Sequence, residues 1–122
     1  MARPLPTVLV ADDEPQVLRL VERLLERAGY TVVSARDGDE ALRALASHAE
    51  RIQVAVLDAA ILPRGCREIL EAIQGTASGI GVVVSSGDVL DDDVERLLRG
   101  CGGVFLRKPY APNQLIHAVE GV

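Results

Sequence analysis

Aromatic side chains are scarce in this sequence: it has no tryptophan, and its aromatic residues are Tyr30, Phe105 and Tyr110. A core must therefore be built from aliphatic side chains, and a hydrophobic content of 48% supplies them and argues against disorder. The lack of aromatics disfavours a surface that stacks nucleic-acid bases. A formal net charge of −5 also disfavours direct binding of nucleic acid, which needs a basic face.

Cysteine and long apolar runs are scarce as well. Cys66 and Cys101 lie far apart with no CxxC motif, which predicts small buried thiols in a reducing cytosol rather than a zinc site or a disulfide framework. No run approaches the roughly 18 apolar residues of a membrane span. Residues 1–6 lack the apolar stretch of a signal peptide. We therefore expect a cytoplasmic protein without a membrane span.

Short apolar runs recur at regular intervals, too far apart for hairpins and with room for one helix between each pair. These runs cover residues 7–11, 31–34, 53–57, 81–85 and 103–106. The central runs, such as Val54–Leu57, are apolar at every position, as in strands covered on both faces.

The segments between and after these runs have apolar residues at helical spacing. Pro15 and Gly29 mark the ends of the first helix, and the acids Asp91–Asp93 suit the start of the fourth. The inward side chains are predicted to be Val17, Leu18, Val21, Leu24, Leu25 and Ala28; Ala41, Leu42 and Leu45; Ile69, Leu70 and Ile73; Val94, Leu97, Leu98 and Cys101; and Leu115, Ile116 and Val119. The pattern predicts one α/β domain over residues 1–122, a (βα)5 flavodoxin-like doubly wound parallel sheet.

Ligands of open parallel sheets bind at the carboxyl ends of the strands, where the strand order reverses. With the strand order 2-1-3-4-5, Asp12 and Asp13 after the first strand lie beside Asp58 after the third. Two such carboxylates about 4 Å apart repel by on the order of 4 kcal/mol at an effective dielectric near 20. The cluster therefore needs a cation, and oxygen ligands select Mg²⁺, Mn²⁺ or Ca²⁺. Lys108, after the fifth strand, supplies a further positive charge.

This set of residues suits phosphoryl transfer. A carboxylate such as Asp58 can act as a nucleophile and form an aspartyl phosphate, while a metal ion neutralises the charge on the phosphoryl oxygens. Lys108 can pair with one phosphoryl oxygen and the Ser86 hydroxyl can donate to another. Gly87 leaves room for the group to approach the backbone.

Four segments carry a resemblance to a known family: VLVADDEP, VAVLDAAILP, VVVSSGD and VFLRKPY, in this order. Over nearly its whole length the chain resembles the response-regulator receiver domains of two-component signalling. The resemblance implies that Asp58 is the phosphoacceptor and that Mg²⁺ is the metal. It implies that Asp13 binds the metal directly, Asp12 through water, and Ala60 through its backbone carbonyl.

The resemblance also implies roles around the rim of the site. Ser86 matches the hydroxyl that follows the phosphoryl group, Lys108 the family's lysine before a cis Pro109, and Phe105 a switching aromatic. The phosphodonor is then a histidine kinase or phosphotransfer protein, and a downstream protein binds the face of the fourth helix, fifth strand and fifth helix. The only reactions expected of the chain are its own phosphorylation and dephosphorylation at Asp58.

Two features depart from the family pattern. Pro63 lies five residues after Asp58, where receivers usually place a proline four residues after the acceptor. Ala60 replaces the longer polar side chain that many receivers use to handle the attacking water, so we expect a long-lived phosphoryl group.

Alternative readings remain open at this stage. A pseudo-receiver would use the same fold as a non-phosphorylated interaction module, and the shifted Pro63 favours it. An aspartate-nucleophile phosphatase is disfavoured, because Ala60 stands where the D-x-D motif needs its second acid. Taken singly, Asp12 and Asp13 are more typical of a helix cap than of a metal site, and Phe105 is more typical of a core residue than of a switch.

Overall fold

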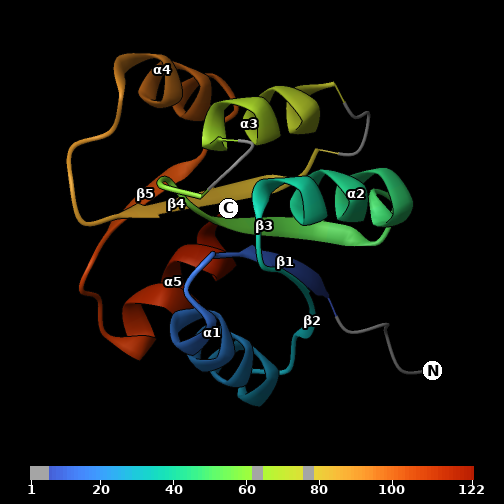
Figure 1. Cartoon of the computed structure of the whole chain (residues 1–122). Coiled ribbons are helices and arrows are strands. Elements are labelled where there is room, and N and C mark those ends of the chain that lie inside the picture. Colours follow the sequence, from blue (N-terminus) through green and yellow to red (C-terminus); the bar gives the residue numbers. More distant parts are fainter. Residues whose placement is uncertain (1–5, 62–64, 76–78) are drawn as a thin grey trace.

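The computed structural model describes residues 6–61, 65–75 and 79–122, and it contains a five-stranded parallel sheet between two layers of helices (Figure 1). Strands and helices alternate along the chain as β1 (Thr7–Ala11), α1 (Pro15–Arg27), β2 (Thr31–Ala35), α2 (Gly38–His48), β3 (Ile52–Asp58), α3 (Cys66–Gln74), β4 (Gly81–Ser86), α4 (Asp92–Gly100), β5 (Val104–Arg107) and α5 (Pro112–Gly121). The strand order is β2-β1-β3-β4-β5, and each neighbouring pair is parallel. The predicted fold and strand order are therefore confirmed.

Two apolar clusters lie on opposite faces of the sheet. One cluster packs α2, α3 and α4 on one face, and the other packs α1 and α5 on the opposite face. Because both faces are covered, Val54–Leu57 in the central strand β3 are buried at every position. No helix in the described part of the chain is long and apolar enough to cross a membrane.

Local sequence signals set the helix ends as predicted. Pro15 occupies the first turn of α1, and Gly29 follows the helix with a φ of 99°, a conformation that glycine adopts without a steric penalty. The Asp91 carboxylate accepts a hydrogen bond from the Asp93 amide at 2.9 Å, so it caps α4. Asp91, which precedes α4, therefore has a structural role as the helix cap.

The structure corrects several details. Ala28, predicted to face inward, is exposed because α1 ends at Arg27 and Ala28 is its C-cap. Cys66 is buried as predicted, but Cys101 is only half-buried because it follows the last turn of α4. Pro63, whose position in the sequence departs from the family pattern, lies outside the described residues.

Candidate functional site

The sheet register brings the predicted acids to one edge. Ala11 in β1 pairs with Leu57 in β3, so the residues that follow them, Asp12 and Asp58, lie side by side at the carboxyl ends of the two strands. One carboxylate oxygen from each of Asp12, Asp13 and Asp58 lies within 4.8 Å of the other two. Asp12 and Asp58 are buried, with exposed fractions of 4% and 6%, whereas Asp13 is exposed. Among the described residues, these three carboxylates form the group whose spacing suits a metal ion.

Lys108 provides the counter-charge predicted for this cluster. Its ammonium group lies 3.4 Å from the Asp12 Oδ2 atom and 3.4 Å from the Asp58 Oδ1 atom. Partial burial alone would lower the pKa of Lys108, but the two carboxylates outweigh that effect, so its pKa is raised. The lysine is therefore charged at neutral pH and bridges β1 and β3 from the end of β5.

At Asp12, burial and the neighbouring charges shift the pKa of the carboxyl group. Burial raises its pKa above the usual value because the carboxylate loses water, and the neighbouring Asp58 acts in the same direction. The Glu14 backbone amide, which donates to Asp12 Oδ1 at 2.9 Å, and Lys108 oppose the increase without cancelling it. Without a metal ion, the negative charge at this position is only partly compensated.

The three carboxylates fit a small divalent cation. Opposite oxygen ligands of Mg²⁺ are separated by about 4.2 Å, given metal–oxygen distances of about 2.1 Å. Adjacent ligands lie about 3.0 Å apart in the same octahedron, so oxygens within 4.8 Å of one another must move closer together to bind Mg²⁺ directly. Oxygen ligands alone, with no histidine or thiol among them, select hard cations such as Mg²⁺.

Backbone contacts position the remaining site residues. The Lys108 amide donates to the Ser86 carbonyl at 2.9 Å, which joins the ends of β4 and β5. The Ser86 hydroxyl accepts from the Asp88 amide at 3.0 Å and keeps its own proton available for donation. The Ala60 amide points toward Asp58 Oδ1 at 3.5 Å, and the small Ala60 side chain is exposed.

Phe105 stands apart from the acids. It is 36% exposed on β5 and does not belong to either core cluster, so the interpretation of Phe105 as a core residue is wrong.

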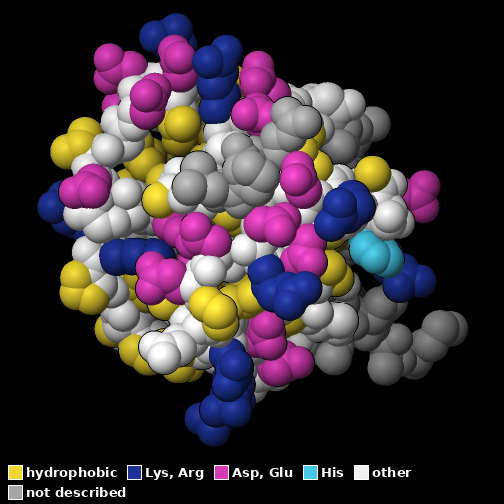
Figure 2. Space-filling view, in the orientation of Figure 1, with side chains coloured by type: hydrophobic (Ala, Val, Ile, Leu, Met, Phe, Trp, Pro, Cys, Tyr) yellow, Lys and Arg dark blue, Asp and Glu magenta, His cyan; other side chains and the backbone are white. Residues whose placement is uncertain are grey.

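The Lys108–Pro109 peptide bond is cis, as the resemblance implied. In Figure 2, acidic side chains gather across the middle of the visible face, with Lys and Arg side chains between them.

The sequence reasoning missed two neighbours of the site. Tyr110 is half-buried, and its pKa is raised by desolvation, with Lys108 opposing the shift and Asp12 adding to it. Cys66 is buried behind the site, where loss of water and the charge of Asp58 raise the pKa of its thiol to about 12. The adjacency of Tyr110 to the Lys-Pro pair was a usable signal, but nothing in the sequence marked Cys66.

The fold and this arrangement of acids and lysine are those of a receiver. The family model of the response regulator receiver domain matches residues 8–120, and the chain belongs to this family.

Curated relatives show the same relationship. The chain is 32% identical over 109 residues to the transcriptional regulatory protein KdpE of Mycobacterium tuberculosis, covering 89% of the chain and 47% of that protein. It is 34% identical over 118 residues to the nitrogen assimilation regulatory protein NtrX of Azorhizobium caulinodans, covering 93% of the chain and 25% of that protein. The chain thus spans half or less of the length of these relatives.

Solved structures agree in fold. A response regulator receiver domain protein from Clostridium thermocellum superposes with a TM-score of 0.83 at 28% identity, over 96% of this chain and 93% of that one. A CheY-like receiver domain protein from Methanospirillum hungatei gives a TM-score of 0.85 at 22% identity, over 97% and 93% of the two chains.

Proposed function

We propose that Asp58 accepts a phosphoryl group from the phosphohistidine of a histidine kinase or phosphotransfer protein. A carboxylate oxygen of Asp58 attacks phosphorus, the new O–P bond replaces the N–P bond, and the imidazole leaves and takes up a proton. The observation that carries the proposal is the Lys108 ammonium 3.4 Å from Asp58, beside a trio of carboxylates within 4.8 Å of one another. The chain is proposed to catalyse only this phosphorylation and the dephosphorylation of Asp58, in which water attacks phosphorus and inorganic phosphate leaves.

Mg²⁺ is the proposed cofactor, held by Asp12, Asp13 and Asp58, with the Ala60 carbonyl as a further ligand. When bound, the ion would neutralise charge on the transferred phosphoryl oxygens. The residues of the chain act around it: Lys108 pairs with a phosphoryl oxygen and the Ser86 hydroxyl donates to another. Lys108 is positioned for this role by Asp12 and Asp58, each of which has a carboxylate oxygen 3.4 Å from its ammonium group.

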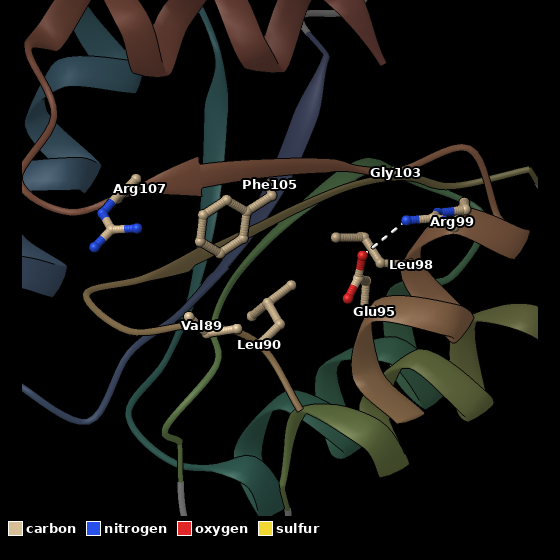
Figure 3. A pocket seen from close by; sticks show the side chains of 8 residues that line it. All are labelled: Val89, Leu90, Glu95, Leu98, Arg99, Gly103, Phe105 and Arg107. Carbon is tan, nitrogen blue, oxygen red and sulfur yellow. Dashed lines mark hydrogen bonds and ion pairs between the residues drawn. The ribbon is translucent and has the colours of Figure 1, made fainter. Parts of the chain in front are cut away.

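A downstream protein is proposed to bind the face formed by α4, β5 and α5. The support is a groove of about 380 Å³ beside β5, into which the Phe105 ring points in Figure 3. The groove is lined by Val89, Leu90, Glu95, Leu98, Arg99, Gly103, Phe105 and Arg107. Val89 is 85% exposed, which leaves an apolar surface for a partner. Amide hydrogen exchange in α4 and β5 should change on phosphorylation of the wild type and stay constant in an Asp58→Asn variant.

The test of the proposed site is the intact mass after addition of Mg²⁺ and acetyl phosphate. We expect a Mg²⁺-dependent gain of one phosphoryl group in the wild type and none in Asp58→Asn, because the amide cannot act as the acceptor. Asp88→Asn is the matched control: it removes an exposed acid next to Ser86 but outside the carboxylate cluster, and it should still be labelled.

The alternative is a pseudo-receiver, an interaction module that is not phosphorylated. The position of Pro63 in the sequence favours it, whereas the intact acid cluster with Lys108 favours the receiver. No mass gain together with no Mg²⁺ binding would select the pseudo-receiver. Labelling that persists in Asp58→Asn would instead refute the assignment of the acceptor.

A further inference from the structure

Helix α4 is weakly anchored to the rest of the molecule. It buries only Val94 and Leu98, whereas α3 buries four residues. It also has open space on both sides: the groove of about 380 Å³ toward β5 and a second groove of about 210 Å³ toward α3. A helix with few apolar anchors and unfilled space beside it can change position at a small cost in packing.

Polar contacts on one side hold α4 toward α3. The Arg67 guanidinium in α3 lies 3.6 Å from the Asp93 carboxylate in the first turn of α4. Toward the other end, the Gln74 side-chain amide donates to the Leu97 carbonyl at 3.3 Å. Both contacts cross the smaller groove, and Figure 1 shows α3 and α4 side by side above the sheet.

We propose that the Arg67–Asp93 ion pair is a latch that holds α4 against α3 and keeps the groove beside Phe105 open. Its effect on phosphorylation rests on the proposed function. Leu98 of α4 and Phe105 of β5 line the same groove (Figure 3). A shift of α4 away from α3 would bring Leu98 closer to Phe105 and narrow this groove. The loop that leads into α4 follows Ser86, the last residue of β4, and so connects the position of the helix to the Asp58 site.

The latch biases the position of α4 without locking it. The side chains of Arg67 and Asp93 are 61% and 52% exposed, so water and salt weaken their attraction. An exposed ion pair of this kind changes an equilibrium by roughly two- to fivefold. Coupling is reciprocal at equilibrium, so if phosphorylation favours the released helix, release of the helix must favour the phosphorylated state by the same factor.

A matched pair of variants tests the latch. Arg67→Gln and Arg96→Gln each remove one arginine that contacts Asp93, but Arg96 lies on α4 itself, 3.9 Å from Asp93, and does not bridge two helices. Arg67→Gln also removes an ion pair within α3, from Arg67 to Glu71 at 3.7 Å, so the comparison is made on the amides of α4. Without any phosphodonor, we expect faster amide hydrogen exchange in α4, by roughly two- to fivefold, in Arg67→Gln only. With Mg²⁺ and a limiting concentration of acetyl phosphate, we expect a larger phosphorylated fraction in Arg67→Gln than in Arg96→Gln.

Each readout can overturn its part of the proposal. Equal exchange in the two variants would show that Arg67–Asp93 does not hold α4. Faster exchange in Arg67→Gln with equal phosphorylated fractions in the two variants would show that the latch is not coupled to Asp58. A wild type that takes no label would refute the proposed function and the coupling, while the exchange measurement would still decide whether the latch exists.

Discussion

At the scale of a single residue, some neighbours of Asp12 stabilise its charged form while its burial destabilises that form. It is buried beside Asp58 and held by the Glu14 amide and Lys108, an arrangement that suits a cation but disfavours the charged acid without one. Its raised pKa means that the folded state holds this proton more tightly than the unfolded chain does. The contribution of Asp12 to stability therefore increases as pH falls through its folded pKa toward the usual value of 3.8, and it is lost at higher pH.

An Asp12→Asn substitution should expose this effect. In metal-free buffer at neutral pH, we expect the variant to unfold at a higher temperature, by on the order of a few degrees, because the neutral amide removes the buried charge. The advantage should shrink as the pH is lowered toward 4. Thermal unfolding followed by circular dichroism at several pH values measures this. A variant less stable than the wild type at pH 7 would show that the Lys108 ion pair outweighs the cost of burial.

Ala60 is expected to set the lifetime of the phosphoryl group. Its methyl side chain cannot orient an attacking water beside Asp58, so hydrolysis lacks positional assistance. We expect the label to persist well beyond seconds in the wild type, and an Ala60→Gln substitution to shorten its lifetime severalfold. Intact mass at timed intervals after removal of acetyl phosphate measures both. Loss within seconds from the wild type, without a phosphatase, would contradict this prediction.

At the scale of elements, the contact between α4 and β5 depends on a glycine. A side chain at Gly103 would collide with Leu98 of α4 and would lie 3.0 Å from the Val82 carbonyl oxygen. The absence of a Cβ atom therefore lets α4 reach the sheet through one of its two buried residues.

Gly103→Ala should consequently destabilise the fold by about 1–3 kcal/mol, the usual cost of overpacking. It should also increase hydrogen exchange in α4 more than elsewhere. Gly121→Ala is the control, since no atom lies within 4 Å of the added methyl group and the residue ends α5. Urea unfolding monitored by circular dichroism measures both. Equal stability of the two variants would mean that Leu98 moves aside without cost.

At the scale of the whole molecule, a cation bound at the acid cluster would link β1 to β3. Binding to the folded state alone raises the free energy of unfolding by about 2.7 kcal/mol at a ligand concentration of one hundred times Kd. We expect Mg²⁺ to raise the Tm of the wild type in a concentration-dependent way, and Asp13→Asn to weaken this response because one of the three carboxylates is lost. Equal shifts of Tm in Asp13→Asn and the wild type would remove Asp13 from the metal site.

The order of elements and the grouping of the acids with Lys108 can be predicted from the sequence. The regular spacing of apolar runs predicts five βα units, and parallel strands deliver Asp12, Asp13, Asp58 and Lys108 to one edge whatever the details of packing. The predicted strand ends agree with the structure to within one residue, and helix ends have local signals such as the cap at Asp91 and the break at Gly29.

Features that depend on contacts between distant segments could not be predicted from the sequence. The exposure of Phe105, the proximity of Cys66 to Asp58 and the ion pair from Arg67 to Asp93 have no local signature. The same applies to the electrostatics of Asp12, whose pKa depends on how much water the surrounding strands exclude. Periodicity fixes which face of an element is apolar, but distances between side chains are set by the packing of helices on the completed sheet.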